Sequence, residues 1–385
     1  MMKFSHNTPV LLRDTLDDSH TFKRLPIPIG DYPYRLNIQQ VLGEGTSRIR
    51  DKMSFHMIGD TGSVRHSAFQ AIVASALAEQ SCVASTTAER PAFLYHLGDI
   101  VYNHGEAIEY PGQFLRPYEN YQAPIFAIPG NHDGDINPET IIPYQSLEAF
   151  MDVFCDSYPR KIGFGRGIKR LSMIQPNVYW TLETPLARFI GLYGNVTKHG
   201  TITAEQRDWF IEELRYAEAQ REEQAVFVCV HQAPYSADAN HGSSMEMVTF
   251  LEEAFLVAGM KPDAVFSGHV HNYQRFSRAY PDGAVVPYIV AGAGGYADLH
   301  TVATLNDSRV KSYSAFSGRV RLEAYCDDCF GFLKMSVEKK PAGLSLIGEY
   351  YTLPKRIVGL DDIKISLHDR FVVPLKRTMY ANVAR

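Results

Sequence analysis

Short apolar runs recur through the middle of the chain, and each one ends at a glycine, a proline or a histidine. The runs are four to six residues long and rich in Val, Ile, Leu, Phe and Tyr, which is typical of buried strands. Polar turns follow them directly. The pattern therefore predicts strands at residues 53–58, 93–97, 124–129, 226–230, 263–267 and 285–290.

Helical periodicity appears between these strands. Ala, Ile, Val and Leu recur at helical spacing over residues 68–83, and Thr203-Ala-Glu-Gln206 forms a capping box that opens a helix at 207–220. A further helix is expected near 145–155. Strands that alternate with helices predict an α/β sheet, and in such sheets functional sites gather beyond the carboxyl ends of the strands.

The two ends of the chain lack the alternation of apolar runs and polar turns that marks its middle. Residues 1–50 are polar and interrupted by prolines, so we expect an N-terminal extended arm. Residues 51–355 are expected to form the main domain, with an insertion at 134–175, and residues 356–385 a C-terminal extension. The basic stretch at 160–170 either faces an anionic substrate or is a solvated loop.

Composition narrows the class of protein. The chain has 385 residues, of which 45% are hydrophobic and 21% charged, with a net charge of −5. A general nucleic-acid binder usually carries basic excess, so no nucleic-acid partner is expected. No apolar segment has the length of a secretory signal or of a membrane span. We therefore expect a cytoplasmic protein without a membrane partner, although an extracytoplasmic location stays open because a signal could have been removed.

The five cysteines are an odd number, so at least one stays unpaired in any set of disulfides. Cys326-Asp-Asp-Cys329 has the spacing of a redox pair or of half a zinc site, but no second such pair accompanies it. The simpler interpretation is a loop or strand-edge pair. Cys229 lies within an apolar run and is expected in the core.

Five of the polar turns carry residue types that bind metals. One such turn alone is usually structural, since Asn and Asp are common turn formers and a lone histidine is more often a core residue. Five in one chain predict a site that mixes oxygen and nitrogen ligands. The turns are Gly59-Asp60-Thr-Gly62, Gly98-Asp99-Ile-Val-Tyr102, Gly130-Asn131-His132-Asp133, Val228-Cys-Val-His231 and Gly268-His269-Val-His271.

In this order the turns resemble the motifs GDxG, GDxxY, GNH followed by Asp or Glu, VxxH and GHxH of the purple acid phosphatases, within the calcineurin-like metallophosphoesterase superfamily. The resemblance covers about residues 53–300, with weaker similarity at 330–333. It implies an α/β fold, the four-layer α/β/β/α sandwich with mixed sheets. The wider superfamily commonly has a histidine ligand where this chain has Gly62. The family often has Leu-Asp-Thr where this chain has Leu192-Tyr-Gly194.

The resemblance also implies a ligand set. One metal would be bound by Asp60, Asp99, Tyr102 and His271, and the other by Asn131, His231 and His269, with Asp99 bridging the two. A phenolate from Tyr102 is a hard anionic donor that suits a trivalent ion. The expected cofactors are therefore Fe(III) and a second divalent metal, which could be Fe, Zn or Mn. The alternative for Tyr102 is a packed aromatic residue.

The implied reaction is hydrolysis of phosphate monoesters of small molecules, with a metal-bound hydroxide attacking phosphorus. His132 is the expected general acid, and Asp133 is expected to orient it. His241, in Asn240-His-Gly242, is a second candidate in the substrate pocket. His104 either reaches the pocket or lies on the surface, and His96 is expected to be structural.

Three other functions share these residues. A phosphodiesterase or nucleotide pyrophosphatase would use the same ligands, and the motifs do not separate it from a monoesterase. A catalytically silent metal-binding or scaffold protein would usually have lost a ligand, and none is lost here. An iron redox protein would usually carry an electron-transfer motif. The sequence leaves the natural substrate, the second metal and the oligomeric state open.

Overall fold

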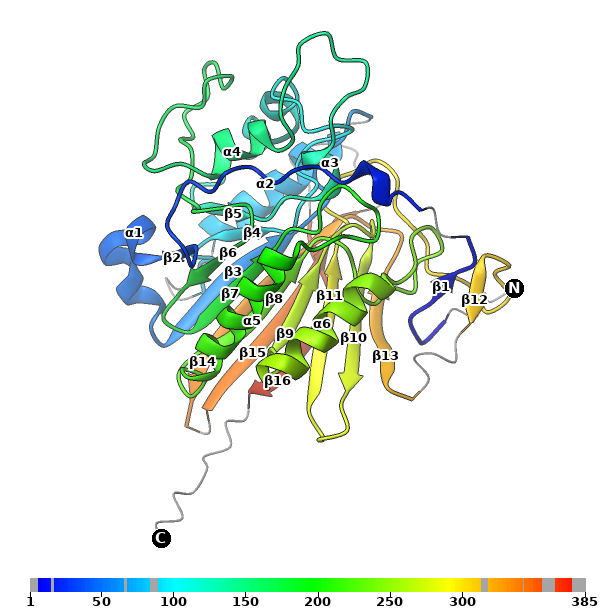
Figure 1. The fold of residues 1–385 in the computed structure, drawn as a ribbon. Coiled ribbons are helices and arrows are strands. Elements are labelled where there is room, and N and C mark those ends of the chain that lie inside the picture. The colour runs from blue at the N-terminus through cyan, green and yellow to red at the C-terminus, as the bar shows by residue number, and fades with distance from the viewer. Residues whose placement is uncertain are drawn as a thin grey trace.

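Two mixed β-sheets form the centre of the molecule (Figure 1). The computed structural model describes residues 6–14, 17–65, 68–83, 89–312, 318–341, 343–354 and 364–375. The larger sheet has the strand order β13-β10-β11-β9-β8-β7-β6-β2, and its four central strands β7, β8, β9 and β11 are parallel. Its strands are β2 (Arg35–Asn37), β6 (Trp180–Glu183), β7 (Ala187–Leu192), β8 (Ala225–Val230), β9 (Ala264–Ser267), β10 (Tyr273–Ala279), β11 (Val285–Ala291) and β13 (Val320–Cys326).

The smaller sheet has the order β16-β15-β14-β3-β4-β5. Strands β3, β4 and β5 are parallel, and β14 adds antiparallel to β3, followed by β15 and β16. Its strands are β3 (Lys52–Ile58), β4 (Leu94–His96), β5 (Ile125–Ala127), β14 (Gly331–Lys340), β15 (Gly343–Thr352) and β16 (Ser366–Leu375).

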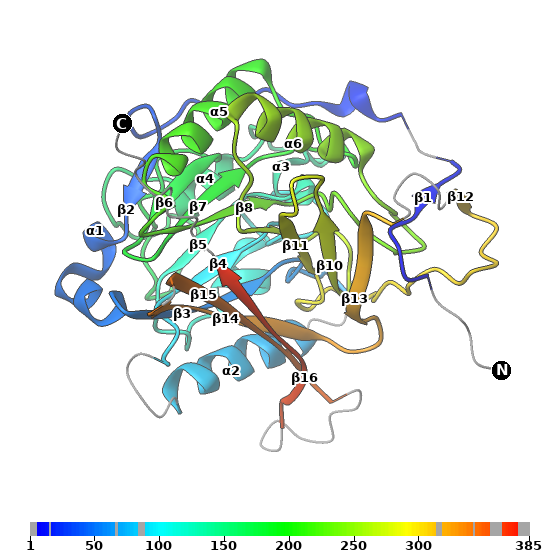
Figure 2. The ribbon, with the colours of Figure 1, turned by 90° about the horizontal axis from the view of Figure 1, so that it is seen from below.

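Helices cover the outer face of each sheet. Figure 2 shows α2 (Ala68–Cys82) beneath the smaller sheet and the pair α5 (Ala204–Glu218) and α6 (Met245–Ala258) over the larger one. The layers are therefore helix, sheet, sheet, helix, which confirms the predicted α/β/β/α sandwich with mixed sheets. The remaining elements are short: α1 (Gln39–Leu42), α3 (Asn131–Gly134), α4 (Glu148–Phe154), η1 (Ser19–Thr21), η2 (Gly43–Ile49), η3 (Pro111–Leu115) and the ribbon of β1 (Leu11–Leu12) with β12 (Val310–Ser312).

Aromatic side chains fill the space between the two sheets. Phe55 of the smaller sheet meets Phe189 of the larger one edge to face, with ring centroids 5.0 Å apart. Tyr95 lies parallel to Trp180 across the same space, at 6.2 Å. All four are almost fully buried. Such pairs add specific geometry to the burial of a large apolar surface, so they fix how the two sheets face each other.

The predicted strands and helices of the central region are confirmed, within a few residues at each end, by β3, β4, β5, β8, β9, β11, α2, α4 and α5. Sequence reasoning missed the central parallel strand β7 and the helix α6. It also missed strands nearer the edges of the sheets, namely β2, β6, β10, β13, β15 and β16. Strands β10 and β13 mix polar with apolar residues because each has a solvent-facing side, so they lack the continuous apolar run that marks the central strands.

The predicted segments outside the main domain contribute to the sheets. The N-terminal segment supplies β2, which pairs with β6 at one edge of the larger sheet. The C-terminal segment supplies β16, which pairs with β15, while residues 355–363 and 376–385 lie outside the described residues. The division into arm, main domain and extension stays a prediction.

Basic residues of the 134–175 segment bond to the protein itself. Arg170 donates from Nη2 to the carbonyl of Tyr118 at 3.1 Å and to that of Tyr121. Arg160 pairs with Asp152 at 3.1 Å. These contacts use the guanidinium groups to hold the segment against its neighbours.

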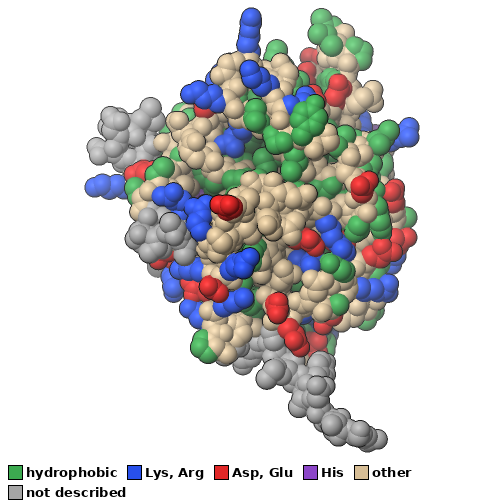
Figure 3. Space-filling model, turned by 90° about the vertical axis from the view of Figure 1, so that its left-hand side faces the viewer, with side chains coloured by type: hydrophobic (Ala, Val, Ile, Leu, Met, Phe, Trp, Pro, Cys, Tyr) green, Lys and Arg blue, Asp and Glu red, His purple; other side chains and the backbone are tan. Residues whose placement is uncertain are grey.

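Charges of both signs are interspersed on the face shown in Figure 3. No helix in the described part of the chain is long and apolar enough to cross a membrane. Cys229 is fully buried in β8, as expected. Cys326 ends β13 and Cys329 follows in the turn before β14, so this pair lies at a strand edge, and neither forms a disulfide.

Candidate metal centre

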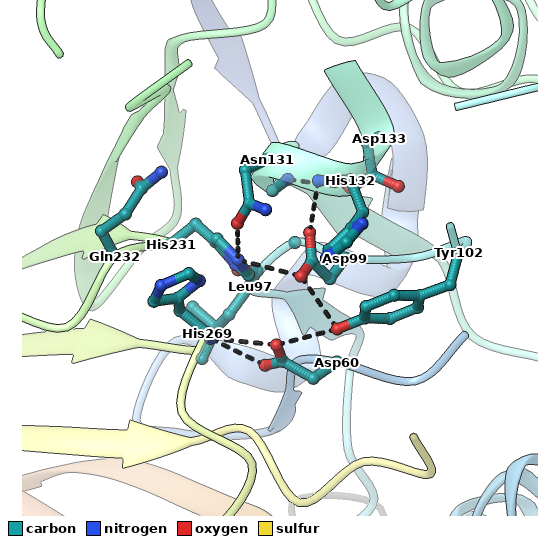
Figure 4. Close-up of polar contacts among 12 residues, drawn as sticks. Asp60, Leu97, Asp99, Tyr102, Asn131, His132, Asp133, His231, Gln232 and His269 are labelled. Carbon is teal, nitrogen blue, oxygen red and sulfur yellow. Dashed lines mark hydrogen bonds and ion pairs between the residues drawn. The ribbon is translucent and has the colours of Figure 1, made fainter. Parts of the chain in front are cut away.

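Five turns from the two sheets meet at one edge of the sandwich. The turns after β3, β4 and β5 come from the smaller sheet, and those after β8 and β9 come from the larger one. Hydrogen bonds join neighbouring turns within each sheet: the Asp60 amide donates to the Gly98 carbonyl at 2.9 Å, and the Gly268 amide donates to the His231 carbonyl at 3.0 Å. Between the two sheets, the His269 amide donates to the Asp60 carboxylate at 2.9 Å. The structure thereby brings all seven predicted metal ligands together, most of them visible in Figure 4.

Three of these residues have a left-handed backbone. The φ angles are 57° at Asp60, 54° at Asp99 and 67° at His269. Residues other than glycine rarely adopt this conformation, and it costs on the order of 1 kcal/mol or more at each position. A strained turn directly after a strand directs the side chain back over the end of the sheet. Local strain is therefore concentrated at the candidate ligands.

A close approach of two turns explains one of the motif glycines. A Cβ atom on Gly130 would lie 2.1 Å from Oδ1 of Asp99, far inside van der Waals contact. Only a glycine leaves the space in which the Asp99 carboxylate lies.

The first predicted ligand group surrounds the phenol of Tyr102. Its oxygen lies 2.8 Å from Oδ2 of Asp99, 3.2 Å from Oδ1 of Asp60 and 3.3 Å from Nε2 of His271. His271 turns Nε2 inward because its Nδ1 lies 3.0 Å from the Asp298 carbonyl, to which it donates. Four side chains from three turns thus converge on one point.

The second predicted group surrounds His231. Its Nε2 lies 3.2 Å from Oδ1 of Asn131 and 3.2 Å from Oδ2 of Asp99. Its Nδ1 donates to the Leu97 carbonyl at 2.8 Å, which fixes the direction of the ring. Ligand atoms of Asp99, His231 and His269 all lie within 4.8 Å of one another. Oδ2 of Asp99 is near both Tyr102 and His231, so this carboxylate lies between the two groups.

The electrostatics of the site call for a cation. Burial, followed by the charge of Asp99, raises the pKa of Asp60 well above its usual range. Burial and the two carboxylates also raise the pKa of the Tyr102 phenol. Burial lowers the pKa values of His269 and His271, so both imidazoles are neutral and keep a lone pair. Buried carboxylates beside a phenol and neutral imidazoles fit metal ions, which would supply the missing positive charge.

Asp99 and His231 form a tightly coupled pair. Burial alone would raise the pKa of Asp99, but His231 and His132 outweigh it and hold that pKa below its usual range. Asp99 in turn overcomes the effect of burial on His231 and raises its pKa. A bound metal would replace this pairing, because the imidazole coordinates only in its neutral form.

His132 lies beside the first ligand group. Its ring centroid is 4.4 Å from that of Tyr102, and its backbone amide donates to Oδ1 of Asp99 at 2.9 Å. Its Nδ1 lies 2.6 Å from the Asn103 carbonyl and donates to it. That bond leaves Nε2 as the free nitrogen, and the side chain is only partly buried, so it is accessible to a ligand.

The predicted hydrogen bond from His132 to Asp133 is wrong. The Asp133 carboxylate instead accepts three backbone N–H bonds, from Gly130 at 2.8 Å, Ile100 at 2.9 Å and Val101 at 3.2 Å. This carboxylate caps the turn that it belongs to and ties it to the turn that carries Asp99. Asp133 therefore positions two motif turns and does not orient the imidazole of His132.

His241 reaches the centre from a separate loop. Its ring centroid lies 4.4 Å from that of His269 and 5.0 Å from that of His300. His104 turns away, with Nδ1 3.0 Å from the carboxylate of Asp135. His96 is buried, and its Nε2 lies 2.8 Å from the Thr61 hydroxyl, which fits a structural role.

Sequence reasoning missed the residues that hold the ligands. His300 is buried and stacks on His271 with centroids 4.2 Å apart. Gln113 bonds to the backbone of Tyr102 from the π-helical turn η3. Neither lies in a motif, and the glycine-rich run at 292–295, which begins the loop carrying His300, was the one available signal.

Comparisons with known proteins agree with this architecture. A family model described as calcineurin-like phosphoesterase matches residues 53–273. A solved structure described as GAP50, the anchor in the inner membrane complex of Plasmodium, is similar to this chain with a TM-score of 0.52 and 14% identity, over 83% of this chain and 90% of that one. A structure of PhoD matches with a TM-score of 0.49 and 14% identity, over 91% and 72%. The family model matches more than half of the length of this chain. The chain therefore belongs to the calcineurin-like phosphoesterases, a family that binds a dinuclear metal centre and hydrolyses phosphoesters.

Proposed function

We propose that this protein is a phosphate monoesterase of the purple acid phosphatase type, which holds Fe(III) beside a second divalent metal, Fe, Zn or Mn. The observation that carries the proposal is the position of the Tyr102 phenol, within 3.3 Å of Asp60, Asp99 and His271. An ionised phenol is a strong, hard donor, and Fe(III) is the biological ion that it suits best.

The structure around Gly62 supports the same proposal. The wider superfamily commonly has a histidine ligand at this position. A Cβ atom here would lie 2.6 Å from the Ile100 carbonyl and 2.7 Å from Oε1 of Gln113, so no imidazole fits. One of these obstacles, Oε1 of Gln113, is also the atom that accepts the Tyr102 amide N–H. The phenol therefore takes the place of the missing imidazole in the ligand set.

The proposed ligands divide as the two geometric groups do. Asp60, Tyr102 and His271 would hold Fe(III), and Asn131, His231 and His269 would hold the divalent ion, with Asp99 shared. When bound, the two metals supply Lewis acidity to the phosphate and a nucleophilic water at mildly acidic pH.

The protein's own groups supply the remaining chemistry. His132 is the proposed general acid: its Nδ1 is fixed on the Asn103 carbonyl, and Nε2 is the atom from which a proton passes to the leaving oxygen. His241 is the proposed phosphate-binding residue, since its ring lies beside His269. Asp133 has no proton-transfer role in this proposal, because its oxygens are occupied by backbone amides.

The test combines metal analysis with matched substrates. Protein purified after growth with iron should contain two metals per chain, one of them iron, and absorb visible light. It should hydrolyse p-nitrophenyl phosphate faster than bis-p-nitrophenyl phosphate below neutral pH. Faster diester hydrolysis would favour the phosphodiesterase or nucleotide pyrophosphatase alternative. Full metal content without hydrolysis of either ester would contradict an enzymatic function.

A further inference from the structure

A pocket of about 110 Å³ opens directly beside the candidate metal centre. His241 and His269 line it. The other lining residues include Leu12, Asp14, Lys198 and Asn240. A phosphate held at the metals would direct its alcohol portion into this space, so the lining residues would contact the leaving group.

The N-terminal segment supplies one wall of this pocket. Figure 1 shows the segment crossing the molecule from β2 to β1. The Val10 amide donates to the Ser236 carbonyl at 2.8 Å, and the Ser243 amide donates to the Val10 carbonyl at 2.9 Å. Val10 is fully buried in a small cluster with Ala239 and neighbours, and Leu12 pairs with Val310 in the β1–β12 ribbon. The wall is therefore anchored on both sides of the His241 loop.

Lys198, on the loop between β7 and α5, also lines this pocket. The Lys198 amide donates to the Asp18 carboxylate at 2.8 Å, so the N-terminal segment also holds this loop. The Lys198 charge is near enough to His241 to act on it, behind the larger effects of burial and of His300.

The pocket thus offers one carboxylate, Asp14, and one ammonium, Lys198. Neither side chain takes part in an ion pair within the part of the chain that the structure describes. Two opposite charges that lie beside a candidate catalytic centre and do not pair with each other can each pair with a ligand.

We propose that this pocket selects phosphate monoesters whose alcohol carries both an ammonium and a carboxylate, as in an O-phosphorylated amino acid. Asp14 receives the ammonium and Lys198 the carboxylate, while Leu12 contacts the carbon chain between them. The inference rests on the monoesterase function proposed above and adds the class of substrate.

Four aliphatic esters separate the two contacts. O-phosphoserine carries both charges, O-phosphoethanolamine lacks the carboxylate, N-acetyl-O-phosphoserine lacks the ammonium, and ethyl phosphate lacks both. Each ester is compared between a variant and the wild type, so that differences in intrinsic reactivity cancel. An exposed ion pair contributes up to about 1 kcal/mol, so a loss of about twofold to fivefold in kcat/KM is expected for each contact.

The variants are Asp14→Asn and Lys198→Met, with Asp31→Asn as a matched control, because Asp31 is exposed on the same N-terminal segment outside the pocket. Asp14→Asn should lower kcat/KM for phosphoserine and phosphoethanolamine more than for the other two esters. Lys198→Met should lower kcat/KM for phosphoserine and N-acetylphosphoserine more than for the other two esters. Asp31→Asn should change kcat/KM by the same factor for all four esters.

Equal effects of each variant on all four esters would overturn the inference. The monoesterase function proposed above is tested separately. Hydrolysis of ethyl phosphate or p-nitrophenyl phosphate supports that function, whether or not the enzyme prefers phosphorylated amino acids. If no ester is hydrolysed, the affinity of each metal-loaded variant for the four esters is measured by calorimetry. The same pattern in Kd supports the proposed selectivity, and equal changes in Kd for all four esters overturn it.

Discussion

Gln113 holds both polar groups of the Tyr102 backbone. Its Oε1 accepts the Tyr102 amide N–H at 2.9 Å, and its Nε2 donates to the Tyr102 carbonyl at 2.5 Å. The Gln113 carbonyl in turn accepts a bond from the side chain of Gln70 in α2. The position of the candidate phenolate is thus set by a buried amide eleven residues further along the chain, outside all five motifs.

Replacing this amide should disturb the proposed iron site without changing a proposed ligand. Gln113→Ala leaves two buried backbone groups without partners, at a cost of roughly 1–3 kcal/mol for each group, and frees Tyr102 to move. We expect a shifted, weaker visible band and lower iron affinity. Gln122→Ala, at an exposed glutamine, is the control. An unchanged spectrum in Gln113→Ala would contradict a positioning role.

The visible absorption of the iron-loaded protein tests whether the Tyr102 phenolate binds iron. Tyr102→Phe removes the only proposed donor of a tyrosinate charge-transfer band, so the iron-loaded variant should be colourless. Tyr296→Phe is a close control, because the Tyr296 ring lies 4.2 Å from that of Tyr102 but its phenol is outside the proposed ligand set. Absorbance is recorded alongside iron content. Colour that survives in Tyr102→Phe and disappears in Tyr296→Phe would reassign the ligand.

Removing a shared or terminal ligand should remove metal and activity together. Asp99→Ala and His271→Ala each delete a donor from a buried site, so metal affinity should fall by more than the roughly 10–100-fold typical of outer-shell partners. His20→Ala, at an exposed histidine, is the control. Metal content by elemental analysis and p-nitrophenyl phosphate turnover are measured on the same samples. Full activity in either ligand variant would refute its assignment.

His132 should separate chemistry from metal binding. His132→Ala removes the proposed proton donor and should lower kcat by roughly 10²–10⁴, with metal content retained. His104→Ala is the matched control, since the His104 imidazole bonds to the Asp135 carboxylate and His104 is outside the proposed catalytic set. A second measurement uses a leaving group of low pKa, for which the loss should shrink. Loss of metal from His132→Ala would instead indicate a structural role.

The metal-free protein should lose stability in acid through His56. This imidazole is fully buried between the Tyr121 hydroxyl, 3.0 Å from Nδ1, and Oε1 of Gln80, 2.8 Å from Nε2. Burial lowers its pKa to about 3. Between that value and the ordinary pKa near 6.5 the unfolded chain binds more protons than the folded one, so stability falls as pH falls through this window.

The expected slope is about 1.4 kcal/mol per pH unit for this group. Urea unfolding of chelator-treated protein at pH 6.5 and pH 5 should therefore show a loss of about 2 kcal/mol that His56→Gln does not show. The variant can be less stable at both values, because only the difference between the two matters. Parallel pH dependences in variant and wild type would exclude His56 as a source.

Sequence reasoning singled out the candidate ligands because each lies in a turn that follows an apolar strand, and chain direction brings the ends of these strands to one edge. It did not find Gln113 or His300, because Gln113 lies in the short turn η3 and His300 in a loop, and the position of each depends on tertiary packing. It was wrong on Asp133 for a related reason. Neighbours in sequence suggest a mutual hydrogen bond, whereas the helical turn α3 directs this carboxylate toward the backbone of another turn.

The tight packing at Gly62 also bears on how such sites change during evolution. By sequence, a site with a histidine ligand and a site with a tyrosine ligand differ at two positions. Here, however, the Ile100 carbonyl and the Gln113 side chain fill the space that a histidine at position 62 would need. Passage between the two ligand types must involve Gly62, Tyr102 and Gln113 jointly. These three positions are therefore coupled by packing, and a substitution at one of them changes what the other two can accommodate.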